Sequence, residues 1–242
     1  MAANAEEASE PLEDMPASAS ETTALLTALS WFSPSFPIGA FSYSHGLEWA
    51  VETGWVTDET SLSKWIEGLL TNGSGWTDAV FFSEAWRRGA SSQSTDDLCE
   101  LAVALQPSAE RLLETTAQGR AFLETVSAAW LPDASAMFND DRSSHPYPVI
   151  AGALCATAGL PLKTALLAFV HGFVANLISA GQRIIPLGQK SGQIVTVQMK
   201  PVIEDVAARA STACLDDLGG AAFRSDIASM QHETQYTRLF RS

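Results

Sequence analysis

Hydrophobic residues recur along most of this chain at the three- and four-residue spacing of an amphipathic helix. The clearest case is 57–70, where Leu62 and Ile66 fall on one face and Thr57 or Asp58 precedes the pattern as an N-cap candidate. The same reasoning predicts further helices at about 22–32, 42–53, 77–86, 96–106, 107–130, 149–158, 161–183 and 220–235.

Short polar or glycine-rich stretches separate these segments. The sequence Thr-Asn-Gly-Ser-Gly at 71–75 predicts a turn, so that Thr77 or Asp78 would open the next helix, in which Glu84 and Arg88 are spaced as an i, i+4 pair. Pro107 suits the first position of the helix that follows it. The apolar side expected of the first helix includes Leu25, Leu26 and Leu29.

One segment, 192–198, alternates apolar and polar residues in the manner of a strand. A single strand with no partner elsewhere in the chain is improbable, so we interpret this segment as helix by elimination. The elements together predict an all-α fold: one domain over 22–242, built as a bundle of about nine or ten helices.

Nineteen uncharged residues at 164–182 approach the length that crosses a bilayer. The stretch contains His171, Asn176 and Gln182 and is rich in Ala and Gly, which suits close packing between helices. A central buried helix, with His171 as a core residue, is therefore favoured over a membrane span.

Composition narrows the class of protein. The net charge is −14 and the 14 basic residues are scattered along the chain from Lys64 onward, which argues against a nucleic-acid partner. Acidic residues among Ala, Ser and Pro predict a disordered leader over 1–21. Cys99, Cys155 and Cys214 are far apart and form no CxxC pair, which indicates buried thiols in a reducing, cytoplasmic compartment.

The segment 33–48 is the loop whose sequence restricts the backbone most strongly. Pro34 and Pro37 fix the backbone, Gly39 permits a conformation closed to other residues, and Ser42 stands where an N-cap would. The expected helix would then carry in its first turns Ser42, Tyr43, Ser44, His45 and Glu48.

A second unusual segment is the break at 180–193, where a long apolar helix stops at Pro186 and restarts after Gly188. Three glutamines cluster there. Their uncharged amides either satisfy backbone groups freed by the break or line a polar passage or a partner surface, and the sequence leaves these alternatives open. The glutamines are Gln182, Gln189 and Gln193.

The third is the tail, 232–242, which combines aromatic residues with arginines as interface hot spots do. Alternatively, Leu239 and Phe240 fold back onto the core.

Candidate chemistry is sparse. His45 and Glu48 would share a helix face, more often a capping and surface pair than two metal ligands. A metallochaperone that binds nickel through His45, Glu48 and His232 is the alternative function. Asp140 and Asp141 resemble half of an acidic motif of helical prenyl-transfer enzymes but lack a third carboxylate at the needed spacing. The sequence therefore predicts neither an enzyme nor a bound cofactor.

Taken together, the loop, the Pro186-Leu-Gly-Gln189 break and the tail resemble the urease accessory protein F family, from about residue 22 onward. The resemblance implies an all-helical, dimeric, non-enzymatic protein. It would bind the accessory protein called D or H, recruit the GTPase G, dock on apo-urease and assist nickel insertion, and it would influence the GTPase.

The resemblance also implies which segments meet partners. The tail would order only when D/H binds, and an arginine at the interface would serve as an anchor more often than as an arginine finger. The expected partner-binding residues are Ser42, Tyr43, His45, Glu48, Arg183, Pro186, Leu187, Gly188, Gln189, Gln193, His232, Glu233, Gln235, Tyr236, Arg238, Leu239, Phe240 and Arg241.

Overall fold

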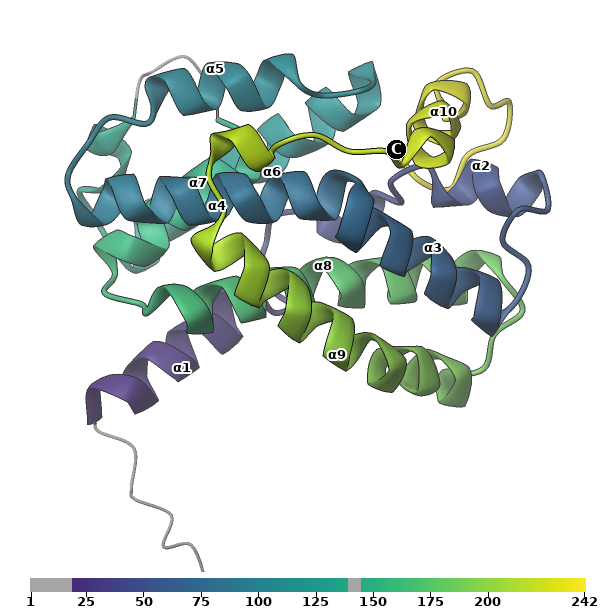
Figure 1. Cartoon of the computed structure of the whole chain (residues 1–242), viewed down its shortest axis with the longest axis horizontal. Helices are drawn as coiled ribbons and strands as arrows, with labels where there is room; N and C mark the ends of the chain where they lie inside the picture. The colour runs from purple at the N-terminus through teal and green to yellow at the C-terminus, as the bar shows by residue number, and fades with distance from the viewer. Residues whose placement is uncertain (1–18, 139–144) are drawn as a thin grey trace, which may run out of the picture.

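The computed structural model describes residues 19–138 and 145–242, and over these residues it is helical without strands (Figure 1), which confirms the all-α prediction. Asp140 and Asp141 lie outside the described residues. The α-helices are α1 (Ala19–Trp31), α2 (Leu47–Glu52), α3 (Glu59–Asn72), α4 (Ser74–Ala90), α5 (Asp96–Ala104), α6 (Ala109–Ala129), α7 (Tyr147–Thr157), α8 (Leu162–Ile184), α9 (Gln189–Thr212) and α10 (Phe223–His232). Short 3-10 turns are η1 (Ala40–Ser42), η2 (Ala134–Met137) and η4 (Leu215–Asp217).

Helix α4 is the centre of the bundle and packs against α3, α7, α8 and α9. Its contact with α7 is very close: a Cβ on Gly152 of α7 would lie 2.3 Å from the carbonyl oxygen of Phe82 in α4. Backbone can therefore approach backbone here only because Gly152 has no side chain.

The substitution Gly152→Ala is expected to destabilise the protein by about 2 kcal/mol, because α4 and α7 must separate to admit the methyl group. Gly68→Ala in α3 is the matched control: its Cβ would meet nothing within 4 Å, so the alanine should stabilise the helix by up to about 1 kcal/mol. Urea unfolding of both variants measures the difference. A Gly152→Ala protein as stable as the wild type would contradict the close contact.

Several helix ends differ from the predicted ones. Asp58 is the N-cap of α3, as expected, but α4 begins at Ser74, directly after Gly73, rather than at Thr77 or Asp78. The extended backbone of Gly73 alone separates the two helices, so the chain does not need the turn of several residues that was predicted at 71–75. The pair of Glu84 and Arg88 is confirmed at 3.1 Å.

Further along the chain, Pro107 is not the first residue of α6. Ser108 caps that helix instead, with its side chain accepting a hydrogen bond from the amide of Arg111. Cys99 and Cys155 are buried as expected, whereas Cys214 is exposed.

Helix α1 turns a different face inward than predicted. Leu25, Leu26 and Leu29 are more than half exposed, and Ala28 and Trp31 are buried in their place. The Trp31 side chain meets Phe122 edge to face, with ring centroids 5.5 Å apart. This large ring sets the orientation of α1, because one buried tryptophan removes more apolar surface from water than any one of the leucines would.

The segment 192–198, which alternates like a strand, lies within helix α9, so its interpretation as helix is confirmed. Val195, Met199 and Ile203 are buried at four-residue spacing, which makes one helix face.

Helix α8 packs against α9, α4, α2 and α1. Among the described residues it is the one helix long and apolar enough to pass a membrane-span test of length and composition, and half of that stretch is buried inside the molecule. His171 is exposed on this helix, so its predicted place in the core is wrong.

Candidate functional site

The loop 33–48 and the tail lie side by side, although they come from opposite ends of the described chain. The amide of Ser44 donates a hydrogen bond to the carbonyl oxygen of Ser242, and the amide of Arg241 donates to that of Ser42, both at 2.8 Å. In Figure 1 the tail ends beside α2 and α10. Two of the three segments singled out by the sequence therefore form one surface.

The loop reaches this position through unusual backbone angles. Gly39 has the left-handed conformation expected of it, at φ 73°, and Gly46 has φ 74°. His45 also has a left-handed φ, of 55°, which costs a residue with a side chain on the order of 1 kcal/mol. Helix α2 begins only at Leu47, so Ser42 does not cap it. The chain must turn inward at His45 before it can become helical.

Glu48 links the loop to the tail. One carboxylate oxygen accepts a hydrogen bond from the amide of Leu239 at 2.7 Å, and the other accepts from the amide of Phe240 at 2.8 Å. Phe240 is buried, and Leu239 is 58% exposed. These hydrogen bonds hold the tail against α2. That the tail orders only when D/H binds stays a prediction. Its backbone groups find their acceptors on α2, and Phe240 folds back onto the core.

A buried network continues from Glu48. Its Oε2 lies 3.2 Å from Nε2 of His232, which is fully buried, and Nδ1 of His232 lies 2.7 Å from Oε2 of Glu110. Arg238 donates to the second oxygen of Glu110 at 2.9 Å. Glu48 therefore pairs with His232 rather than with His45, and the predicted surface pair is wrong because α2 starts after His45.

His45 belongs to a second buried network on α4 and α6. Its Nε2 lies 2.9 Å from Glu114, and Glu114 also contacts the Arg111 guanidinium and accepts a hydrogen bond from the Ser242 hydroxyl at 2.8 Å. Asp78 lies farther from Arg111, at 3.8 Å. This network lies directly beneath the loop and the tail.

Burial and pairing set the charges of this second network. Burial raises the pKa of the Asp78 carboxyl to about 6, against the effect of the Arg111 charge. Burial acts in the same direction on Glu114, but the Arg111 charge, His45 and the Ser242 hydroxyl outweigh it and lower the pKa of Glu114 to about 2. Burial and Arg111 together lower the pKa of His45, so its ring is neutral at pH 7.

The third segment joins the surface through Arg183, near the end of α8. Its guanidinium lies 4.1 Å from the centre of the Phe240 ring and donates a hydrogen bond to the carbonyl oxygen of Phe41. A cation over an aromatic ring contributes about 0.5–1 kcal/mol at an exposed site. Arg183 thus holds both the loop and the tail. We call the loop 33–48, Arg183 and the tail 232–242 the composite surface.

The other predicted residues divide into two groups. Tyr43 accepts from Asn176 through its carbonyl oxygen, Glu233 accepts from the amide of Ala109, and Gln235 donates to Glu52, so all three serve internal contacts. The second group is exposed on the surface and consists of Pro186, Gly188, Gln189, Gln193, Tyr236 and Arg241, whereas Leu187 is partly buried. The Gln189 amide oxygen accepts a hydrogen bond from Gln182 at 3.4 Å.

The part played by Asp78, Glu110, Arg111 and Glu114 was not predicted from the sequence. A signal was present on α6, where Arg111 and Glu114 lie on the same helix face as the buried Phe122. Charged residues on the inward stripe of a helix need buried partners.

The structure does not bring His45, Glu48 and His232 to one point. His45 contacts Glu114, whereas His232 contacts Glu48 and Glu110. Over residues 19–138 and 145–242, no three His, Cys, Asp or Glu side chains are grouped so as to hold a metal ion.

The fold and the site together define an all-helical protein with a surface assembled from segments that are distant in the sequence. The family model UreF matches residues 56–200. A protein of Rhodopseudomonas palustris (strain BisB5) named urease accessory protein UreF is 50% identical over 230 residues, covering 94% of this chain and 95% of the relative. One of the same name from Bradyrhizobium diazoefficiens is 48% identical over 236 residues, covering 96% and 98%. This chain belongs to the UreF family of urease accessory proteins.

Proposed function

We propose that this protein is a non-enzymatic urease maturation factor. The observation that carries the proposal is the family membership, with relatives named urease accessory proteins that align over almost the whole chain. A maturation factor acts through contacts with other urease accessory proteins and with urease itself.

In the finer form of the proposal, the protein works as a homodimer and bridges two partners. The accessory protein D/H binds at the composite surface, and the GTPase G is recruited to the resulting complex, which docks on apo-urease and assists nickel insertion. Support comes from the composite surface itself, because Tyr236 and Leu239 are exposed and the backbone at Leu239 is fixed by Glu48. A fixed backbone lowers the entropy cost of binding.

The role of Arg183 in this proposal is that of an anchor. Its guanidinium is engaged by Phe240 and Phe41 within the chain. An arginine finger must be free to reach the nucleotide of a partner, so the contacts of Arg183 favour a structural part in the composite surface over a direct effect on GTP hydrolysis.

A pull-down with purified partners tests this function. The tagged chain is expected to retain the D/H protein of its own host, and to retain the GTPase G only when D/H is present. Bovine serum albumin serves as the bait control. Failure to retain D/H at micromolar concentrations, with the chain shown folded by circular dichroism, would contradict the bridging role.

A further inference from the structure

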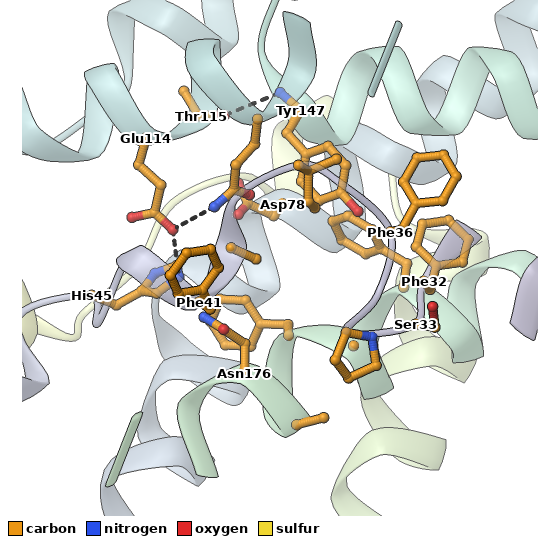
Figure 2. Close-up of a pocket in the computed structure, with 18 of the residues that line it drawn as sticks. Phe32, Ser33, Phe36, Phe41, His45, Asp78, Glu114, Thr115, Tyr147 and Asn176 are labelled. Atoms are coloured by element: carbon orange, nitrogen blue, oxygen red, sulfur yellow. Dashed lines mark hydrogen bonds and ion pairs between the residues drawn. The ribbon is translucent and has the colours of Figure 1, made fainter. Parts of the chain in front are cut away.

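A cavity of about 160 Å³ lies between the loop 33–48 and helices α4, α6 and α8 (Figure 2). Pro34, Phe41 and Ser179 line it and are exposed, so the cavity opens to the surface at these residues. Its inner end is formed by the buried side chains of Asp78 and Glu114. The proposed docking function makes no use of this space.

The walls of the cavity are aromatic. Phe32 and Phe36 come from the loop side, and Tyr147 stands on the helix opposite, with the carboxylates of Asp78 and Glu114 on the far side of the space from Phe32 (Figure 2). Phe169 and Phe173 of α8 complete the lining. The faces of aromatic rings carry partial negative charge and attract cations.

The buried charges at the inner end do not balance. Asp78 and Glu114 supply two carboxylates against the single guanidinium of Arg111, and the His45 ring is neutral at pH 7. Glu114 takes the close contact with Arg111, while Asp78 is left with an ion pair of 3.8 Å and has no hydrogen bond within the described part of the chain. One negative charge is therefore left over in a site that is more than nine-tenths buried.

A further polar atom in this network lacks a partner that the proposed ligand could supply. Nδ1 of His45 is buried and forms no hydrogen bond within residues 19–138 and 145–242. Because Nε2 of the neutral ring is directed at Glu114, Nδ1 is an acceptor, and His45 lines the cavity. Nε of Arg111 is also buried without a partner, but it is a donor and is not satisfied by a cation. Buried polar atoms are usually paired, so this end of the cavity is incomplete as it stands.

We propose that the cavity binds a small organic monocation, a primary ammonium group on a short alkyl stem, with the carboxylate of Asp78 as its counter-ion. The ammonium group donates three hydrogen bonds and neutralises the charge left over at Asp78. The alkyl stem lies against Phe32, Phe36 and Phe169, where a hydrated metal ion would find no ligands. Two sources share this chemistry: a free alkylamine and the side chain of a lysine on a partner protein.

Isothermal titration calorimetry of the full chain with butylammonium chloride at pH 7.5 tests the proposal, with 1-butanol as the uncharged ligand of matched size. Butylammonium is expected to bind at least tenfold more tightly than 1-butanol. The variant Asp78→Asn, which keeps the shape of the side chain, should weaken the binding of butylammonium at least tenfold. Asp97→Asn, at an exposed position of α5 outside the cavity lining, should leave it unchanged.

A second pair of ligands, Nα-acetyl-lysine amide and its Nε-acetylated form, shows whether the ammonium group comes from a lysine side chain or from a free alkylamine. Binding of the first but not the second indicates a lysine side chain, and binding of butylammonium alone indicates a free amine. Equal binding of 1-butanol and butylammonium would overturn the proposal, as would no loss in Asp78→Asn once a thermal melt shows that variant folded. Binding of nickel chloride at Asp78 in place of the amine would also overturn it.

Discussion

Glu114→Gln is expected to lower the free energy of unfolding by about 3 kcal/mol at pH 7. The pKa of Glu114 is about 2 in the folded protein and 4.5 in the ordinary reference state. A carboxyl whose pKa falls on folding contributes stability equal to about 1.4 kcal/mol for each unit of the difference. The variant also leaves Arg111 buried with only the distant carboxylate of Asp78, and a broken buried ion pair is costly.

The difference in stability between wild type and Glu114→Gln should depend on pH in a defined direction. The contribution of a depressed carboxyl is fully present above its unfolded pKa, near 4.5, and is lost as the pH falls toward 2. The difference between wild type and Glu114→Gln should therefore be fully present at pH 7 and shrink below pH 4.5. Urea unfolding at each pH measures it.

The control for this experiment is Glu124→Gln on the same helix, where the side chain is exposed. It should change the free energy of unfolding by less than about 0.5 kcal/mol. A Glu114→Gln variant that behaves like Glu124→Gln would show that the network of His45, Arg111 and Glu114 does not hold the loop and tail onto α6.

The second large effect concerns the composite surface. The double substitution Tyr236→Ala with Leu239→Ala is expected to weaken binding of D/H by more than tenfold. Both side chains are exposed, at 103% and 58%, so their loss removes contact area for a partner without opening the core. Surface plasmon resonance with immobilised D/H gives the dissociation constants.

Point substitutions are more informative here than deletion of 234–242. Deletion would also remove the buried Phe240 and Ser242 and leave Glu48 without the amides it accepts from, so it would destabilise the fold. Val197→Ala on α9 is the matched control, because Val197 is 65% exposed and lies outside the composite surface. Equal weakening by Val197→Ala would contradict a specific role for the tail.

The helices were predictable because the signals for each one, apolar spacing and a capping residue, lie within a few residues of each other in the sequence. Leu62 and Ile66 mark α3 by spacing alone, and Asp58 marks its start. Even the strand-like segment 192–198 resolves as helix, since Met199 and Ile203 continue the four-residue spacing beyond it. Helix ends were less predictable, because a single extended residue such as Gly73 can end one helix and admit the next.

The candidate site was predictable only in part. The sequence marks the loop and the tail as specified segments, but their pairing depends on contacts between residues almost two hundred positions apart, such as Glu48 with Phe240. Arg111 and Glu114 lie on the helix face that continues to Phe122, but their partners Asp78 and His45 come from other segments of the chain. The α6 pattern alone does not identify these partners. The exposed leucines of α1 have the same origin: packing of Trp31 overrides the local pattern.

Urease activity in cells tests the central claim most directly. The host strain lacks its own UreF-family gene and carries this chain with the urease subunits and other accessory proteins of the chain's native host, grown with nickel. Active urease is expected with the wild type and with Val197→Ala, and little urease activity is expected with the Tyr236→Ala, Leu239→Ala double variant at equal protein level. Inactive urease with the wild-type chain, or full activity with the double variant, would contradict it.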